Sequence, residues 1–325
     1  MSQYTIDYWR SNLFNYQKMK FYEFLALTTN FNELLKYLCT KNVIRAKVKC
    51  PRCNNVVELT GDQSLIIHCT QHYYKQVKGR KRRRVICNFK ISALTGTWFA
   101  QSVINITVSC RLICYVMMMN CPQQRFLEKE LNISSCTAVD WVNFCRELMN
   151  KWLMCKQNPI GGNGIIVEID EAFGRRKYHR GRLITGQWLF GGIQRGTKNM
   201  FVVPVVSRSA EVLLLLIEKY IAPGSIIYSD CWKAYKKIDK KIYQHSVVNH
   251  SENFVDPNTG IHTQNIERLW RDIRGGIPQY GRIEYHFHHY LAEFIFKKTY
   301  DFNERLDAFF EIMSTMYLLT ENINE

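Results

Sequence analysis

The feature that most constrains this chain is an ordered series of strand and helix patterns that follows a glycine-rich joint at residues 161–164. Strand-like runs come at 165–169, 187–194 and 200–206, a helix at 210–220 that ends at Pro223, a strand at 225–229, a short helix, a strand at 246–248 and a helix at 265–273. Such alternation is typical of the α/β class. The order predicts a mixed five-stranded sheet with helices, in the order of an RNase H-like fold.

Three carboxylates stand in this region in contexts that suit metal-dependent phosphoryl transfer. Asp170 closes the first strand, Asp230 closes the fourth, and Glu267 lies in the last helix. One aspartate at a strand end is usually a turn or cap residue, but the three together can converge on two divalent cations that hold the attacking and leaving oxygens at phosphorus. Oxygen ligands favour Mg²⁺ or Mn²⁺, two per active site. Glu168 shares the strand face of Asp170, and Glu171 points to the other face.

Cationic residues accompany these acids. Arg274 follows Glu267 by seven positions, about two helical turns, so both lie on one helix face and Arg274 can hold DNA phosphate; a salt-bridged surface helix is the alternative. A basic loop also follows the first aspartate, where it can clamp phosphates near the scissile bond. Its cations are Arg175, Arg176, Lys177, Arg180 and Arg182.

The charge balance favours a polyanionic partner. Lys and Arg number 44 against 28 Asp and Glu, which gives a net charge of +16 and a pI near 9.3, as expected for a nucleic-acid-binding protein. No apolar run approaches a membrane span, since 112–119 is far too short, and the N-terminus lacks the layout of a secretory signal. We therefore expect an intracellular protein, in which most of the 12 cysteines are buried thiols or metal ligands instead of disulfides.

Four of these cysteines predict a structural zinc site. Cys50 and Cys53 form a Cys-x-x-Cys knuckle, and Cys69 and Cys87 complete a set of four thiolates. The spacing of the second half is irregular, and His72 competes with Cys69 in a Cys-x-x-His knuckle. Unliganded buried thiols and a redox pair are the alternatives.

A block of six positive charges in seven residues lies between these cysteines. It can track a DNA backbone, serve as a nuclear import signal or form a solvated loop. Its cationic residues are Lys78, Arg80, Lys81, Arg82, Arg83 and Arg84.

Helical patterns at 123–130 and 136–150, joined by a turn at 131–134, suit a helix-turn-helix whose second helix enters the major groove. An ordinary helical hairpin is the alternative. Base-reading candidates are Ser135, Thr137, Asp140 and Asn143, with Arg146 on phosphate.

Changes in pattern divide the chain into five segments. They are an N-terminal helical segment at 1–45, a zinc-ribbon-like unit at 46–100, a helical DNA-binding region at 101–158, a catalytic domain at 159–300 and a C-terminal helix at 301–325.

The motifs in the second half resemble Merlin-type transposases and their bacterial insertion-sequence relatives. The similar segments are IDEAFGRRKYHRGR (169–182), GQWLFGG (186–192), PGSIIYSDCWKAY (223–235), VNHS (248–251), FVDPNTG (254–260) and HTQNIERLW (262–270). A cysteine shortly before the 91–99 stretch also resembles the family and favours Cys87 as the fourth zinc ligand.

This resemblance implies a DDE transposase with an RNase H-like domain, whose acidic triad falls on Asp170, Asp230 and Glu267. It implies binding to double-stranded DNA at terminal inverted repeats, cleavage at the element ends, joining of the 3′-hydroxyl to target DNA, and a homodimer or higher oligomer. Some bacterial relatives use asparagine in the third role. Asn265 stands two positions before Glu267, about 200° away around a helix, so only one of them can face the metals.

Two other functions remain open: a domesticated, catalytically silent DNA-binding protein, and a nuclease that cleaves without joining. The basic block and the resemblance favour a nuclear location, with the bacterial cytoplasm expected if the source is prokaryotic.

Overall fold

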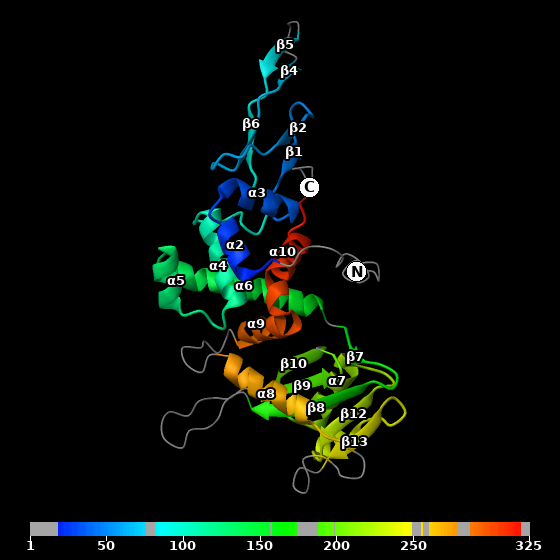
Figure 1. Ribbon diagram of the computed structural model, residues 1–325. Helices are drawn as coiled ribbons and strands as arrows, with labels where there is room; N and C mark the ends of the chain where they lie inside the picture. Colours follow the sequence, from blue (N-terminus) through cyan, green and yellow to red (C-terminus); the bar gives the residue numbers. More distant parts are fainter. Residues whose placement is uncertain are drawn as a thin grey trace. The chain divides into compact units, whose positions relative to one another are not determined.

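The computed structural model describes residues 19–75, 82–156, 158–173, 188–197, 199–248, 255, 260–277 and 287–319. The chain forms two compact units, which we treat separately (Figure 1). The first comprises the residues up to Cys145 together with those from Tyr300 onward, and the second runs from Arg146 to Thr299. None of the helices in the described ranges is long and apolar enough to cross a membrane.

A five-stranded mixed sheet forms the centre of the second unit, with the strand order β10-β9-β8-β12-β13. Its strands are β8 (Ile166–Phe173), β9 (Trp188–Gln194), β10 (Met200–Val205), β12 (Ile226–Asp230) and β13 (Gln244–Val248). β8, β9 and β10 are antiparallel neighbours, whereas β12 runs parallel to both β8 and β13. The predicted mixed sheet of five strands is confirmed, with strand bounds close to those read from the sequence.

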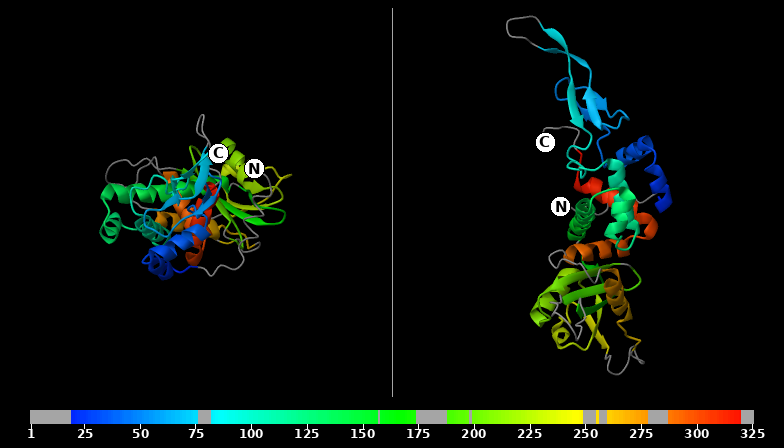
Figure 2. Two further views of the ribbon diagram at one scale, coloured as in Figure 1. Left: turned by 90° about the horizontal axis from the view of Figure 1, so that it is seen from above. Right: turned by 90° about the vertical axis from the view of Figure 1, so that its left-hand side faces the viewer.

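Helices cover both faces of this sheet (Figures 1 and 2). The helical elements of the second unit are α7 (Ala210–Tyr220), η1 (Lys233–Lys237), α8 (Gln264–Gly276) and α9 (Phe287–Thr299), and the short strands β7 (Ile160–Gly161) and β11 (Ile221–Ala222) pair in parallel. Val167, Ile169 and Ile227 share a buried cluster with Leu213 and Ile217 of α7. Because side chains alternate along a strand, the neighbouring residues of β8 face the opposite side, where α8 lies.

The first strand is longer than the sequence pattern indicates. β8 continues three residues beyond Asp170, because Asp170 to Phe173 still pair with β9. Pairing with β12, in contrast, ends at Glu168. Asp170 therefore lies just beyond the point where β8 and β12 part, and Asp230 is the last residue of β12.

Helices build the larger part of the first unit. They are α2 (Phe21–Leu27), α3 (Phe31–Thr40), α4 (Ile106–Met118), α5 (Gln124–Leu131), α6 (Ser135–Cys155, whose end belongs to the second unit), η3 (Phe302–Glu304) and α10 (Arg305–Met316). Aromatic pairs hold them together: Phe24 lies 5.6 Å from Phe310, and Trp98 lies 5.3 Å from Trp141, between ring centroids. Asn30 lies between α2 and α3, and its side chain caps α3 by accepting from the backbone N–H groups of Asn32 and Glu33.

The strands in the described part of the first unit form three antiparallel pairs, seen without labels in Figure 2. The pairs are β1 (Lys47–Lys49) with β2 (Val56–Glu58), β3 (Ile66–Cys69) with β6 (Phe89–Ser92), and β4 (His72–Lys75) with β5 (Arg83–Ile86). The β4–β5 pair extends away from the helices of the same unit in Figure 1 and in the right-hand view of Figure 2. These strands surround the predicted zinc ligands and form the small β unit expected from the sequence.

The predicted helical pair is present as α5 and α6. Asn132 ends α5 in the left-handed conformation, with φ of 51°, which turns the chain sharply before Ser135 begins α6. The turn lies where the sequence placed it.

Candidate acidic site and cysteine cluster

Two of the predicted catalytic acids lie on one face of the sheet. Tyr228 of β12 pairs with Glu168 of β8, so alternation two residues further places Asp230 and Asp170 on that same face. Burial raises the pKa of Asp170 to about 7, and repulsion from Asp230 and Glu171 adds to the shift. The Trp232 backbone N–H donates to Asp230 Oδ1 at 3.0 Å. The structure thus concentrates negative charge where β8 and β12 part.

Helix α8 brings an indole to this site. Trp270 Nε1 donates to Asp170 Oδ2 at 3.0 Å. Gly191 stands opposite Asp170 in β9, and a Cβ at Gly191 would lie 2.7 Å from the indole, closer than packing allows. The lack of a side chain at Gly191 therefore lets Trp270 reach across the sheet to orient Asp170.

Glu267 lies in the first turn of the same helix, three residues before Trp270, and so on the same helix face. Its Oε1 accepts from Thr263 Oγ1 at 3.3 Å. The contact between Trp270 and Asp170 therefore directs this face of α8 toward the aspartates.

Glu168 anchors the N-terminus of α8. Its side chain is fully buried, and its Oε2 accepts from the backbone N–H groups of Asn265 and Ile266 at 2.9 and 3.1 Å. Arg195 Nε donates to Oε1 at 2.6 Å, and the same guanidinium donates to the His262 carbonyl at 2.8 Å. Thr263, the N-cap residue, makes no side-chain cap. The Glu168 carboxylate thus accepts hydrogen bonds from backbone N–H groups that have no partner within the first turn of α8. Its negative charge also interacts favourably with the helix dipole.

Asn265 contacts this anchor instead of the aspartates. Its Nδ2 donates to Glu168 Oε1 at 2.7 Å. Since Asn265 and Glu267 diverge by about 200° around the helix, this bond supports Glu267 as the residue that faces Asp170.

The opposite face of the sheet carries a second polar group. Tyr235 OH donates to Glu171 Oε1, and burial raises the pKa of Glu171 to about 6. The Arg208 guanidinium lies 3.8 Å from the ring centroid of Trp188 and 4.6 Å from that of Trp232. Glu171 is therefore separated from the Asp170 face, as its place in the strand predicts.

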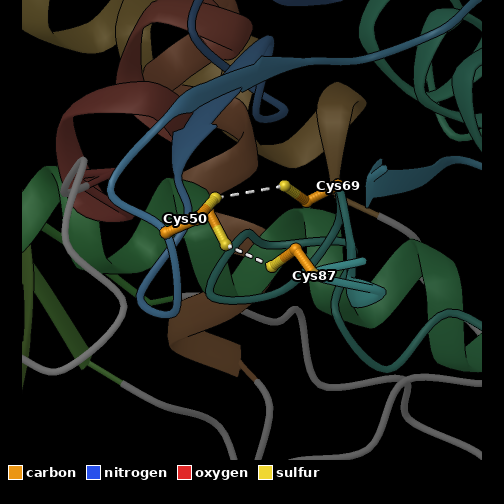
Figure 3. A group of neighbouring side chains, drawn as sticks. Cys50, Cys69 and Cys87 are labelled. Carbon is orange, nitrogen blue, oxygen red and sulfur yellow. Dashed lines mark hydrogen bonds between the residues drawn. The ribbon is translucent and has the colours of Figure 1, made fainter. Parts of the chain in front are cut away.

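The four predicted zinc ligands converge. The sulfurs of Cys50, Cys53, Cys69 and Cys87 all lie within 4.8 Å of one another, with Cys50 to Cys87 at 3.3 Å and Cys53 to Cys69 at 3.4 Å. Figure 3 shows Cys50, Cys69 and Cys87 pointing toward one another. His72 is not part of the group, so the arrangement favours Cys69 over His72. Four thiols at this separation could hold a structural zinc ion.

The acids are gathered less closely than the cysteines. Among the residues that the structure describes, the cysteine cluster is the one group of three or more possible ligands brought together in this way. Asp170 and Asp230 share a face, and Glu267 approaches from α8, but their oxygens do not form a comparably tight set.

The structure describes some of the cationic residues that were predicted to contact DNA, and others lie outside the described residues. Arg82, Arg83, Arg84 and Arg274 are exposed. Lys78, Arg80, Lys81, Arg175, Arg176, Lys177, Arg180 and Arg182 lie outside the described residues.

Arg146 was predicted to contact phosphate, and the structure places it elsewhere. It is 8% exposed, its Nε lies 2.7 Å from Glu293 Oε2, and its guanidinium lies 4.4 Å from the ring centroid of Tyr290. Lys297 also pairs with Glu293 at 2.5 Å. Arg146 and Lys297 lower the pKa of the buried Glu293 carboxyl despite its burial. Arg146 therefore forms an internal ion pair and does not face solvent. Among the base-reading candidates, Ser135 and Asp140 are exposed, whereas Thr137 and Asn143 are half-buried.

The sequence reasoning missed the supporting residues. Glu168 was placed on the face of Asp170 but given no role, and Gly191, Arg195 and Trp270 were not singled out. The alternation in β8 was a signal for Glu168, because an acid two positions before Asp170 must share its face. The partners of the other three residues depend on tertiary packing.

Comparisons with known proteins find similarity to transposases. Residues 159–299 match a family model described as an ISXO2-like transposase domain. A protein of Haemophilus influenzae called an uncharacterized transposase-like protein is 27% identical over 95 residues, which cover 29% of this chain and 76% of the relative.

These similarities refine the expectations from the sequence. The match is to ISXO2-like transposases and does not single out the Merlin type. The relative is bacterial, which fits the prokaryotic alternative, and no observation supports a nuclear location. Residues 159–299 are therefore similar to an ISXO2-like transposase domain.

Proposed function

We propose that this protein is a DDE transposase with an RNase H-like catalytic domain. It binds the terminal inverted repeats of its own element, cleaves the DNA at the element ends and joins the freed 3′-hydroxyl to target DNA. The transposase match supports the reaction class, and the order of three antiparallel strands followed by two parallel ones supports the fold.

One observation supports this proposal: Asp170 and Asp230 lie on the same side of adjacent parallel strands, and Trp270, three residues beyond Glu267 in α8, contacts Asp170. Repulsion between neighbouring carboxylates raises the pKa of Asp170 beyond the effect of its burial. A divalent cation relieves such repulsion, so the donor set fits Mg²⁺ or Mn²⁺.

In the proposed mechanism, Asp170, Asp230 and Glu267 would hold the divalent cations. Bound cations lower the pKa of water and stabilise charge at phosphorus. Trp270 fixes one oxygen of Asp170, and Glu168 fixes the start of the helix that carries Glu267. Arg274, exposed two turns beyond Glu267, is placed to hold DNA phosphate.

The remaining parts serve DNA binding. We propose a structural Zn²⁺ on Cys50, Cys53, Cys69 and Cys87, which form the gathered cluster. Double-stranded DNA is the partner that the net charge of +16 favours. Synapsis of two element ends requires a dimer or larger assembly, because one chain offers one set of acids.

A joining assay with pre-cut ends tests the proposal. Wild-type protein, Mg²⁺ and a duplex ending in the repeat should yield products joined to a target plasmid, and Asp230→Asn should yield none while binding the duplex equally well. Full activity of Asp230→Asn would overturn the metal model. Cleavage of intact ends without joining would instead identify a nuclease, and repeat binding without either reaction would identify a domesticated DNA-binding protein.

A further inference from the structure

We propose that the exposed face of the β4–β5 hairpin enters the DNA major groove and reads bases. This inference rests on the proposed function, since it assigns part of the repeat recognition to one surface. The face, called the ribbon face below, consists of His72, Tyr74, Arg84 and Ile86.

The pairing register establishes that these four residues share a side. His72 pairs with Ile86 and Tyr74 pairs with Arg84, and directly paired residues of an antiparallel ladder project to the same face. All four are exposed, including two large side chains, Tyr74 at 67% and Ile86 at 60%.

The other side of the hairpin is already occupied. Tyr73 pairs with Val85; both are half-buried, and Tyr73 packs against the cysteine cluster. The cluster therefore orients the hairpin, with Tyr73 turned inward and the ribbon face turned outward. Zinc on the four thiolates would hold that orientation.

The charge around the ribbon face specifies a polyanion as its occupant. Residues 63–127 contain no aspartate or glutamate, while Arg82 and, on the opposite face of the hairpin, Lys75 and Arg83 are exposed. A second copy of this chain would bring like charges together, which opposes association. Cationic flanks around an apolar centre suit DNA, with phosphates at the sides and base edges between them.

The dimensions and side chains also fit base reading. The major groove is about 12 Å wide and admits a two-stranded β-ribbon, whose strands lie about 4.8 Å apart. An arginine such as Arg84 pairs with the O6 and N7 of guanine, and apolar side chains such as Tyr74 and Ile86 contact thymine methyl groups. Arg83, on the opposite face near the hairpin end, is placed for phosphate.

Selection of bound duplexes from a random-sequence library tests this inference with the full, zinc-loaded chain. We expect the wild type to select a motif, and Tyr74→Ser combined with Ile86→Ser to lose preference at one block of adjacent base pairs while keeping the salt dependence of binding. Arg83→Ala is the matched control: it should weaken binding to all sequences alike and reduce the salt slope by about 1. Zinc content and circular dichroism should be unchanged in both variants.

The ribbon face does not read bases if the double variant selects the wild-type motif with unchanged preference. A change in sedimentation with an unchanged motif would make this face a contact between protomers and would also overturn the proposal. Failure of the wild type to select any motif would contradict repeat recognition itself. If the double variant keeps the wild-type motif and α6 variants at Ser135 and Asp140 lose it, base reading belongs to α6 alone. The proposed function would then stand without the ribbon face.

Discussion

The cysteine cluster and the acidic site are built in opposite ways. The cluster lies among short two-stranded pairs, and its buried core comprises Cys50, Cys69 and Cys87. The acidic site lies on a five-stranded sheet that packs a large apolar core through Val167, Ile169 and their neighbours. The proposed ligands of the cluster are therefore its core, whereas the proposed ligands of the acidic site are additions to a core that already exists.

We therefore expect metal binding to affect folding at the cysteine cluster and catalysis at the acidic site. At the cluster the binding free energy is folding free energy. At the acidic site the positions are set beforehand, by the bond from Trp270 to Asp170 and by the anchoring of α8 on Glu168. We expect the first metal to determine structure and the second to determine reaction rate.

Removal of zinc should have the largest effect. Structural zinc contributes roughly 10 kcal/mol or more in small zinc domains, so chelation should release the amide protection of the strand pairs β3–β6 and β4–β5 while the strands β8 and β12 keep theirs. Hydrogen exchange measures both. Cys69→Ser should mimic chelation, and Cys155→Ser, which replaces an exposed thiol outside the cluster, should not. Simultaneous loss of amide protection in β8 and β12 would contradict the claim that zinc stabilises only the unit around the cysteines.

The next effect in size concerns the third acid. Glu267→Gln should lower the rate of DNA cleavage by roughly 10²-fold or more, the scale on which removal of one electrostatic stabiliser acts, with DNA affinity and unfolding midpoint preserved. Asn265→Ala tests the alternative on the other side of the helix. A greater loss of rate in Asn265→Ala than in Glu267→Gln would reverse the assignment.

Glu168→Gln should have an intermediate effect on stability. Gln cannot accept all the bonds that Arg195 and the α8 backbone donate, so a loss of about 2 kcal/mol in the free energy of unfolding is expected. The control is Lys298→Met, which removes an ion pair to Asp272 that is 2.6 Å long but largely exposed and should cost less than about 1 kcal/mol. Urea denaturation compares them, and equal losses would show that the anchor is no stronger than a surface pair.

The smallest effect should be the pH dependence of the free energy of unfolding in protein without added Mg²⁺ or Mn²⁺. The pKa of Asp170 is raised from 3.8 to about 7 in the folded protein, so the folded state holds a proton that the unfolded chain releases. The stability contributed by protonated Asp170 is full below about pH 4 and is lost as pH rises through 7.

The difference in urea midpoint between wild type and Asp170→Asn, measured from pH 4 to 8 in zinc-loaded protein without added Mg²⁺ or Mn²⁺, isolates this residue. The wild type should lose stability relative to the variant as pH rises, and Mg²⁺ at pH 8 should restore it. A midpoint difference that stays constant from pH 4 to 8 would mean that ionisation of Asp170 does not destabilise the folded protein.

Much of the fold could be read from sequence because the relevant signals are local. The strands around Asp170 and Asp230, the helix of Glu267 and the Cys-x-x-Cys knuckle each lie in short patterns. The extension of β8 beyond Asp170 was missed because pairing with β9 sustains it. Arg146 was misjudged because its partner Glu293 is 147 positions away, and no local pattern reveals such a contact. The base-reading role of α6 and the catalytic roles of the acids stay predictions.

The most direct test of the central claim is Mg²⁺-dependent cleavage and strand transfer on DNA that carries the flanking repeats, with wild-type protein beside Asp170→Asn. We predict cut and joined products from the wild type alone, with equal repeat binding by both proteins. Equal activity of both, or repeat binding without products from either in Mg²⁺ or Mn²⁺, would contradict the assignment of a metal-dependent transposase.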